Sequence, residues 1–217
     1  MENINWQLVA EQLRKPHGEM ANEIGKRMNE SNAAMNRLLI HTLDLKSGME
    51  ILEIGMGNGL FVNEIFQKQP DIHYTGIDYS SEMVEASKKE NLHLEDKVTF
   101  LNIPIESLSS SETLYDVIFT VNTIYFWDQP GKTLAGIRSL LNPNGRLYLA
   151  FRPKSIMLEH PFTEYGFTLY SLEDAIALLE TGGFKIENVT EANDDPSASL
   201  GGQTLALSSI ILQAIKE

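Results

Sequence analysis

The sequence predicts an α/β fold, with a doubly wound and mostly parallel sheet of seven strands and a helical extension at the amino terminus. Three observations predict it. Short apolar runs alternate with segments of helical periodicity between residues 49 and 151, as in repeated βαβ units. Three glycines, Gly55, Gly57 and Gly59, form the turn between the first run and the first helix. The last two expected strands have no helix between them, so we expect a hairpin and an antiparallel final strand.

Each strand is an apolar run bounded by turn residues. We expect strands at Glu50–Ile54, Ile72–Ile77, Val98–Leu101, Val117–Val121, Arg146–Phe151, Phe184–Val189 and Gln203–Ile215. The fourth strand is apolar on both faces, which predicts a place at the centre of the sheet. The polar run 194–202 before the last strand is expected to be a mobile loop.

The helices are predicted from apolar spacing and from capping residues. We expect them at Leu60–Gln67, from Ser80 or Ser81 to Glu90, along the stripe Leu134–Leu141, and from Ser171 to Gly182. Ser171 and Asp174 have the spacing of a capping box, and the two glycines that follow Thr181 are typical of a helix end.

Residues 1–46 form the expected helical extension. Apolar residues recur at helical spacing between Glu19 and Leu43, and the Pro16-His17-Gly18 loop interrupts the pattern before them. This extension could fold over the ligand crevice as a lid. Residues 47–217 are expected to form the ligand-binding domain.

Composition excludes several classes of function. The chain has 217 residues and a formal charge of −13, which disfavours binding to nucleic-acid phosphates. Cysteine is absent, so disulfides, thiolate nucleophiles and iron–sulfur clusters are excluded. Neither clustered carboxylates nor paired histidines predict a metal site. No signal pattern and no apolar run of about 18 residues is present, so we expect a cytoplasmic protein without a membrane partner.

The glycine turn predicts the kind of ligand. Asp78 ends the second strand, 23 residues after Gly55, where nucleotide-binding βαβ units place an acceptor for ribose hydroxyls. A dinucleotide loop would need a glycine at position 60, which is Leu60 here, and the P-loop pattern is missing. Glu53 precedes the turn, and its carboxylate would repel a pyrophosphate but suit an amino group and a sulfonium. The sequence therefore predicts an adenosine-type ligand of that kind.

The order Glu53-x-Gly-x-Gly-x-Gly, followed by Gly76-Ile77-Asp78-Tyr79-Ser80, resembles the class I S-adenosylmethionine-dependent methyltransferases between Met49 and about Phe151. The Leu-Arg-Lys-Pro-His-Gly string in the extension is similar to bacterial type-11 members. The resemblance implies a Rossmann-like domain that binds S-adenosyl-L-methionine and releases S-adenosyl-L-homocysteine.

The resemblance also implies roles for particular residues. The methionine half of the cofactor would face Glu53, Gly55, Gly57, Asn58 and Gly59. Asp78 would accept hydrogen bonds from both ribose hydroxyls. The adenine would lie between Ile103 on one face and Tyr79 and Met83 on the other, with Asn102 at its exocyclic amine and Asn122 near the sulfonium. The turn Asn142-Pro143-Asn144-Gly145 resembles the family's Pro-Gly-Gly turn, in which Asn tolerates a positive φ.

The acceptor is less clearly encoded, because in-line methyl transfer needs mainly proximity and a dry pocket. The fourth strand leads into Tyr125-Phe126-Trp127 without the prolines typical of base and amide methylases, which favours a small-molecule acceptor. Tyr125 is a candidate catalytic or wall residue, or packs against the next helix, as we expect for Phe126. His17 is a candidate base, or an ordinary surface residue, and the same choice holds for His160.

Two other classes of function remain open. A non-catalytic S-adenosylmethionine-binding or interaction protein would have the same fold. A nicotinamide-dependent oxidoreductase is disfavoured by Leu60 in the place of the sixth-position glycine. Oligomeric state is not encoded in any visible pattern.

Overall fold

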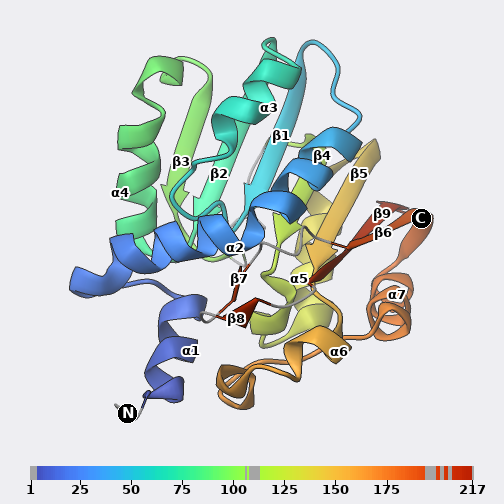
Figure 1. Cartoon of the computed structure of the whole chain (residues 1–217). Helices are drawn as coiled ribbons and strands as arrows, with labels where there is room; N and C mark the ends of the chain where they lie inside the picture. Colours follow the sequence, from blue (N-terminus) through green and yellow to red (C-terminus); the bar gives the residue numbers. More distant parts are fainter. Residues whose placement is uncertain are drawn as a thin grey trace.

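The expected sheet is present in the computed structural model, which describes residues 4–105, 107, 113–193, 199–200, 203–204 and 207–216, with the side chains of 199–200 and 203–204 excepted. Seven strands follow the order β3-β2-β1-β4-β5-β9-β6 (Figure 1). They are β1 (Met49–Ile54), β2 (Ile72–Asp78), β3 (Val98–Asn102), β4 (Tyr115–Val121), β5 (Leu141–Phe151), β6 (Phe184–Asn193) and β9 (Ser208–Lys216).

Strand directions confirm the predicted hairpin. The first five strands pair in parallel, whereas β9 is antiparallel to both β5 and β6. Most of the polar run 194–202 lies outside the described residues. Ser199–Leu200 of that run form the two-residue strand β7, which pairs with β8 (Gln203–Thr204) in a separate small sheet. The prediction that the last strand begins at Gln203 is therefore wrong, since β9 begins at Ser208.

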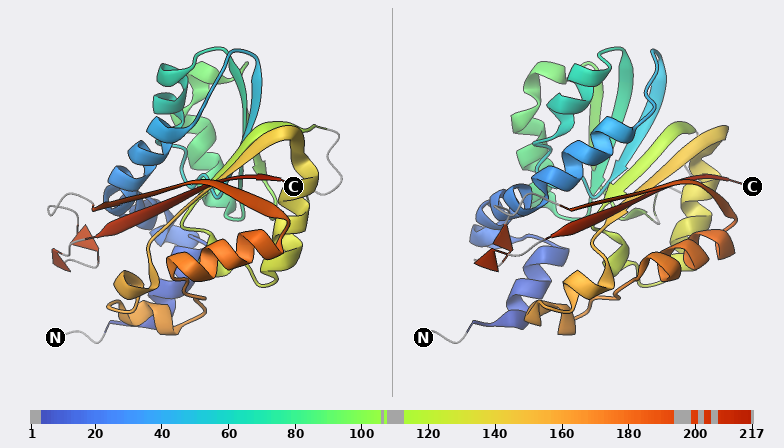
Figure 2. Two further views of the ribbon diagram at one scale, coloured as in Figure 1. Left: turned by 90° about the vertical axis from the view of Figure 1, so that its right-hand side faces the viewer. Right: turned by 45° about the vertical axis from the view of Figure 1, so that its right-hand side comes forward.

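Helices cover both faces of the sheet (Figure 2). They are α1 (Trp6–Arg14), α2 (Ala21–Thr42), α3 (Val62–Lys68), α4 (Ser81–Glu90), α5 (Pro130–Leu140), α6 (Lys154–Met157) and α7 (Leu172–Thr181). Short 3-10 turns lie at Gly18–Met20, Leu92–Leu94, Ile124–Phe126 and Pro161–Glu164. Among the described residues, no helix has the length and apolar character that a membrane crossing would require.

Alternation along the strands divides the core in two. Ile51 of β1 and Phe119 of β4 pack with α2 and α3, whereas Leu52 and Ile118 pack with α5 and α7 on the opposite face. Since side chains alternate along a strand, a strand with apolar residues on both faces supplies both cores. This explains why β4 lies at the centre of the sheet, as predicted.

Capping residues set the helix starts that the sequence predicts. The Ser80 hydroxyl accepts a hydrogen bond from the backbone N–H of Met83, 3.2 Å away, so α4 begins after Ser80. Ser171 and Asp174 form a reciprocal capping box at the start of α7. An aspartate therefore serves where glutamate is usual.

The predicted turn at Asn142–Gly145 is wrong. The chain passes from α5 directly into β5, and neither the asparagines nor Gly145 has a positive φ. Six residues of β5, Leu141 to Arg146, lie opposite only three of β4, Tyr115 to Val117, so the segment is a bulge within the strand. Gly145 is needed for space, because a Cβ there would lie 2.9 Å from the Tyr115 carbonyl oxygen.

Two glycine substitutions separate this steric requirement from helix propensity. Gly136→Ala in α5 meets no atom within 4 Å, so we expect the free energy of unfolding to rise by about 0.5–1 kcal/mol. Gly145→Ala should lower it by about 1–3 kcal/mol, as overpacking does. Urea unfolding measures both, and an unchanged midpoint for Gly145→Ala would contradict the steric account.

Candidate active site

A cleft of about 490 Å³ opens beyond the carboxyl ends of β1, β2 and β4, where ligands bind in open α/β sheets. The N-terminal segment closes its other side, with α1 lying beyond these strand ends (Figure 1). Seven of the residues that the sequence assigns to cofactor binding line this cleft: Gly55, Gly57, Asp78, Tyr79, Met83, Ile103 and Asn122. The other four, Glu53, Asn58, Gly59 and Asn102, lie outside its lining.

The three glycines of the turn after β1 serve two purposes. Two of them leave room for neighbouring side chains, and one leaves the backbone exposed to the cleft. All three glycines have φ between 58° and 75°, a region that disfavours residues with a Cβ. A Cβ on Gly55 would lie 2.4 Å from Thr123, and one on Gly59 would lie 2.8 Å from Asn91. Gly57, in contrast, faces open space at the cleft. The middle glycine therefore leaves the backbone free for a ligand.

Asp78 joins the glycine turn to the next helix. One carboxylate oxygen accepts from the Gly57 N–H at 3.0 Å, and the other accepts from the Ser80 N–H at 2.8 Å. Burial raises the pKa of Asp78 to about 6, although these backbone hydrogen bonds lower it. Asn102 lies behind, and its amide donates to the Asp78 carbonyl oxygen at 3.0 Å.

Glu53 is a second acid close to half-buried Asp78, and it is more deeply buried. Its side chain is 6% exposed and accepts a 2.6 Å hydrogen bond from the Tyr74 hydroxyl. Burial raises the pKa of Glu53 from its ordinary 4.5 to about 7, against the effect of Tyr74 and with a further rise from the Asp78 charge. Neither carboxylate has an ion-pair partner in the part of the chain that the structure describes.

Apolar side chains flank Asp78. Met83 is buried, and Ile103 lines the cleft after β3. Tyr79 is 54% exposed, with the Lys15 ammonium 3.9 Å above its ring, in cation–π geometry. Asn58 instead accepts a hydrogen bond from the side chain of Asn29 in α2, at 3.0 Å.

Asn122 has a strained backbone at the tip of β4. It is the one non-glycine residue with a positive φ, 56°, in the described chain. Its N–H donates to the Ala150 carbonyl at 2.9 Å, and its side-chain amide donates to Asn32 of α2 at 3.0 Å. Strain of this kind persists where surrounding contacts fix it, which is common at functional sites.

Tyr125 lies beneath the cleft and does not line it. Its hydroxyl accepts from the Arg152 N–H at 2.6 Å and lies 3.1 Å from the Asn122 side-chain oxygen. Burial raises the pKa of this hydroxyl above its ordinary value. The aromatic residues that do line the cleft are Tyr79, Phe126 and Trp127. Phe126 also packs against Phe167, with 4.7 Å between ring centroids.

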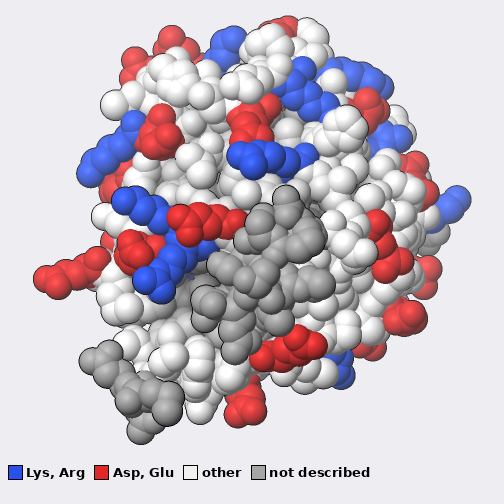
Figure 3. Space-filling model, viewed as in Figure 1, with Lys and Arg blue, Asp and Glu red and all other residues white. Residues whose placement is uncertain are grey.

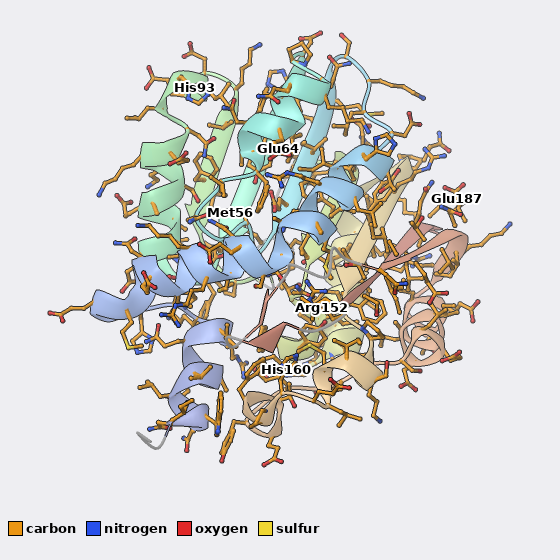
Figure 4. All side chains as sticks on the ribbon, viewed as in Figure 1. Met56, Glu64, His93, Arg152, His160 and Glu187 are labelled. Atoms are coloured by element: carbon orange, nitrogen blue, oxygen red, sulfur yellow. The ribbon has the colours of Figure 1, made fainter. Side chains whose placement is uncertain are left out.

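The two histidines considered from sequence lie away from the cleft lining. The Nδ1 atom of His17 is 3.0 Å from the Lys15 carbonyl oxygen. His160 is 5% exposed, stacks on Phe162, and lies near α6 below Arg152 (Figure 4). Its Nε2 has no hydrogen-bond partner among the described residues, and burial lowers its pKa. No group of three or more potential metal ligands occurs in the same described ranges.

Sequence reasoning missed most of the contribution of the N-terminal segment. Met28 and Asn32, one helical turn apart in α2, line the cleft together with Leu13, Arg14 and Pro16. The i, i+4 spacing of Met28 and Asn32 is a signal that could have placed them on one face. The remaining missed residues belong to loops after β3 and β4 and to the start of α5, and among them are Ile105, Thr123, Asp128, Gln129 and Lys132.

Comparisons with known proteins agree with this architecture. Residues 52–147 match the model of a family described as a methyltransferase domain. The uncharacterized methyltransferase YdaC of Bacillus subtilis is 27% identical over 128 residues, which cover 58% of this chain and 69% of YdaC. A malonyl-[acyl-carrier protein] O-methyltransferase of Halalkalibacterium halodurans is 31% identical over 144 residues, which cover 61% of this chain but only 52% of that enzyme.

The fold likeness extends further than the sequence likeness. A chain from the complex between the Haloferax volcanii Trm112 methyltransferase activator and a methyltransferase superposes with a TM-score of 0.78 at 17% identity, covering 90% of this chain and 93% of that one. Strand order, glycine turn and strand-tip acid define a class I methyltransferase-like fold. Residues 52–147 are thus similar to a methyltransferase domain, so the predicted resemblance to methyltransferases is confirmed.

The buried charge of Glu53 should make stability depend on pH. A carboxyl group whose folded-state pKa is raised stabilises the fold below its unfolded pKa and loses that contribution as pH rises to the folded value, here from 4.5 to about 7. We compare the free energy of unfolding of Glu53→Gln with that of the unsubstituted protein. The difference in favour of the variant should grow by about 2–3 kcal/mol from pH 5 to pH 8. Denaturant titrations at several pH values test this.

Glu90→Gln, at an exposed position of α4, is the matched control and should show no such gain. The electrostatic account is contradicted if both variants have parallel stability profiles across the range.

Proposed function

We propose that this protein transfers a methyl group from S-adenosyl-L-methionine to a small-molecule acceptor by in-line displacement. The observation that carries the proposal is the Asp78 carboxylate, which is hydrogen-bonded to the glycine turn and faces the cleft at the strand tips. S-adenosyl-L-homocysteine is the expected product.

The site suits this donor for two physical reasons. Gly57 presents open backbone at the cleft, so a ligand can lie against the turn without meeting a side chain. Glu53 is a buried acid and Asp78 a half-buried one, and neither has an ion-pair partner in the described chain. A ligand with an ammonium and a sulfonium would compensate their charge. When bound, the donor supplies an electrophilic methyl group.

The residues of the chain have mainly binding and orienting roles in this proposal. Asp78 binds the ribose hydroxyls, and each of its oxygens retains a free lone pair. Ile103, Met83 and Tyr79 hold the adenine, with Asn102 at its edge. Glu53 attracts the amino group from beneath the glycine turn, and Gly55, Asn58 and Gly59 shape that turn. Asn122 stands near the sulfonium, positioned by Tyr125.

We further propose that residues 1–46 form a lid on the domain of residues 47–217. Three polar contacts hold the segment down at successive positions. Arg14 forms a bidentate ion pair with Asp128, at 2.8 and 2.9 Å, and the Gly18 N–H donates to Glu82 at 3.0 Å. Between them the Ser80 hydroxyl donates to the Pro16 carbonyl oxygen. A closed lid excludes water and so favours displacement by the acceptor over side reactions.

Neither catalytic candidate from the sequence has direct access to the cleft. Tyr125 is engaged with the Arg152 backbone, which suits positioning of Asn122 better than proton transfer. A base role for His17 would require its imidazole to move inward with the lid. The proposal needs no base when the acceptor is already nucleophilic.

The size and charge of the molecule support a small acceptor. A cleft of about 490 Å³ lies in the usual range for small-molecule sites. Acidic and basic side chains are interspersed on the face shown in Figure 3, where no continuous basic stripe crosses the described residues. Phosphate backbones require such a stripe. Absence of a nucleic-acid partner and a cytoplasmic location both stay predictions.

Removal of the Asp78 carboxylate tests the donor site. We expect Asp78→Ala to weaken S-adenosylmethionine binding by about 1–3 kcal/mol, the cost of unmet hydrogen bonds at a buried site. Isothermal titration calorimetry measures this, with Asp96→Ala, at an exposed position outside the cleft, as the control. Asp78 also holds the glycine turn, so its removal could change the shape of the cleft. Asp78→Asn removes the charge but keeps the size of the side chain, and therefore separates the two effects.

A metabolite panel, with S-adenosylhomocysteine as the detected product, then tests turnover. Donor binding without product across a broad panel would favour the non-catalytic alternative. Unchanged affinity in Asp78→Ala would remove this residue from the ribose role.

Loss of the Arg14–Asp128 pair tests the lid. Because both side chains are partly or largely exposed, at 41% and 77%, the pair is screened by solvent and has a modest effect. We expect Arg14→Ala to raise the donor dissociation rate about two- to fivefold and to speed hydrogen–deuterium exchange in residues 6–18. Arg27→Ala, which removes an ion pair within α2, is the control. Equal dissociation rates in both variants would contradict the lid.

A further inference from the structure

The part of the cleft away from Asp78 has apolar walls and a charged mouth. Leu13 of α1 and Phe126 and Trp127, which follow β4 two strands away from β2, line the walls. The mouth is lined by Arg14, Asp128, Gln129 and Lys132. Because the proposed donor occupies the end at Asp78 and the glycine turn, this second end is where the acceptor must lie.

The charged side chains of the mouth differ in whether they already have a partner of opposite charge. Arg14 is already neutralised by both carboxylate oxygens of Asp128. Asp78, the other acid of the lining, accepts two backbone hydrogen bonds. Lys132 has no carboxylate within ion-pair distance among the described residues. The mouth therefore holds one available positive charge.

The position of Lys132 is also unfavourable for the helix that carries it. Lys132 lies in the first turn of α5, which has no acidic residue. The positive end of the helix dipole lies at this turn, so a cation there costs stability rather than adding to it. A residue that opposes the local preference without a compensating contact indicates a functional requirement.

We infer that the methyl acceptor is a small carboxylic acid with an apolar body, and that Lys132 binds its carboxylate. This inference rests on the proposed function and names the substrate class for that site. The apolar body packs against Phe126 and Trp127, and the carboxylate lies at the mouth beside Lys132 and Gln129. Lys132 determines specificity and takes no part in the displacement itself.

The same charges disfavour other acceptor classes. A phosphate dianion would meet a single available ammonium and the nearby Asp128 carboxylate. A cationic acceptor would suit the aromatic wall, but Lys132 would repel it and Asp128 is already paired. With Arg14 paired to Asp128 and Asp78 assigned to the donor, Lys132 is left to bind a single negative charge.

Binding measurements with matched ligands test this inference. The protein is first loaded with S-adenosylhomocysteine, and calorimetry confirms loading. Benzoic, phenylacetic, 4-hydroxybenzoic and hexanoic acids are then titrated, each beside its primary amide, which keeps the shape and removes the charge. We expect acids to bind at least about tenfold more tightly than their amides, the usual effect of a charged hydrogen bond.

Three variants assign the preference to one side chain. Lys132→Gln should bring acids and amides to equal affinity, whereas Lys132→Arg should retain the preference. Lys89→Gln, the same change of charge at an exposed position on α4 outside the cleft, should leave it unchanged. For any acid that is methylated, Lys132→Gln should raise KM about tenfold with kcat little altered. Thermal melts confirm that each variant is folded.

Equal binding of acids and amides, tighter binding of the corresponding amines, or no binding of any acid would overturn the inference. Failure of the proposed function is distinguishable: without the donor site S-adenosylhomocysteine would not bind at the loading step, and a non-catalytic protein would bind it but give no product in the metabolite panel.

Discussion

The architecture of the site depends on one carboxylate. Asp78 ends β2 and accepts hydrogen bonds from the Gly57 N–H in the turn after β1 and from the Ser80 N–H at the start of α4. These two bonds fix the separation of two loops that the sheet alone would leave independent. The cleft between them is therefore shaped before any ligand arrives, which lowers the entropy that binding must overcome.

Shape and charge are set by the same group. Burial raises the pKa of Asp78 to about 6 and that of Glu53 to about 7, so the fold without ligand holds two acids at unfavourable positions. A cationic ligand relieves that cost, whereas a neutral analogue of the same shape relieves less of it. In the proposed reaction the donor loses its sulfonium charge on methyl transfer. The same acids would then bind the product less tightly than the donor, which favours release.

Sequence predicted those parts of the site that local rules determine. The strands, the glycine turn, the caps at Ser80 and Ser171 and the position of Asp78 follow from periodicity and short-range hydrogen bonding. The bulge at Asn142–Gly145 did not, because its geometry is set by the Tyr115 carbonyl on a neighbouring strand. Burial of Tyr125 beneath the cleft was equally hidden, since its partner, Arg152, lies 27 residues away. Contacts between distant segments have no local signature.

The N-terminal segment shows why such distant contacts matter for function. Asn32 in α2 accepts from the Asn122 side chain, and Asn122 in turn accepts from the Tyr125 hydroxyl. Tyr125 accepts from the Arg152 backbone, just after β5. Arg152 in turn donates to the Ser31 carbonyl, next to Asn32. This closed circuit ties the proposed lid helix to the tips of β4 and β5. Because every member is fixed by the next, movement of α2 would shift Asn122, the residue proposed nearest the reacting centre. Lid position and alignment for displacement are therefore coupled through hydrogen bonds rather than through the ligand alone.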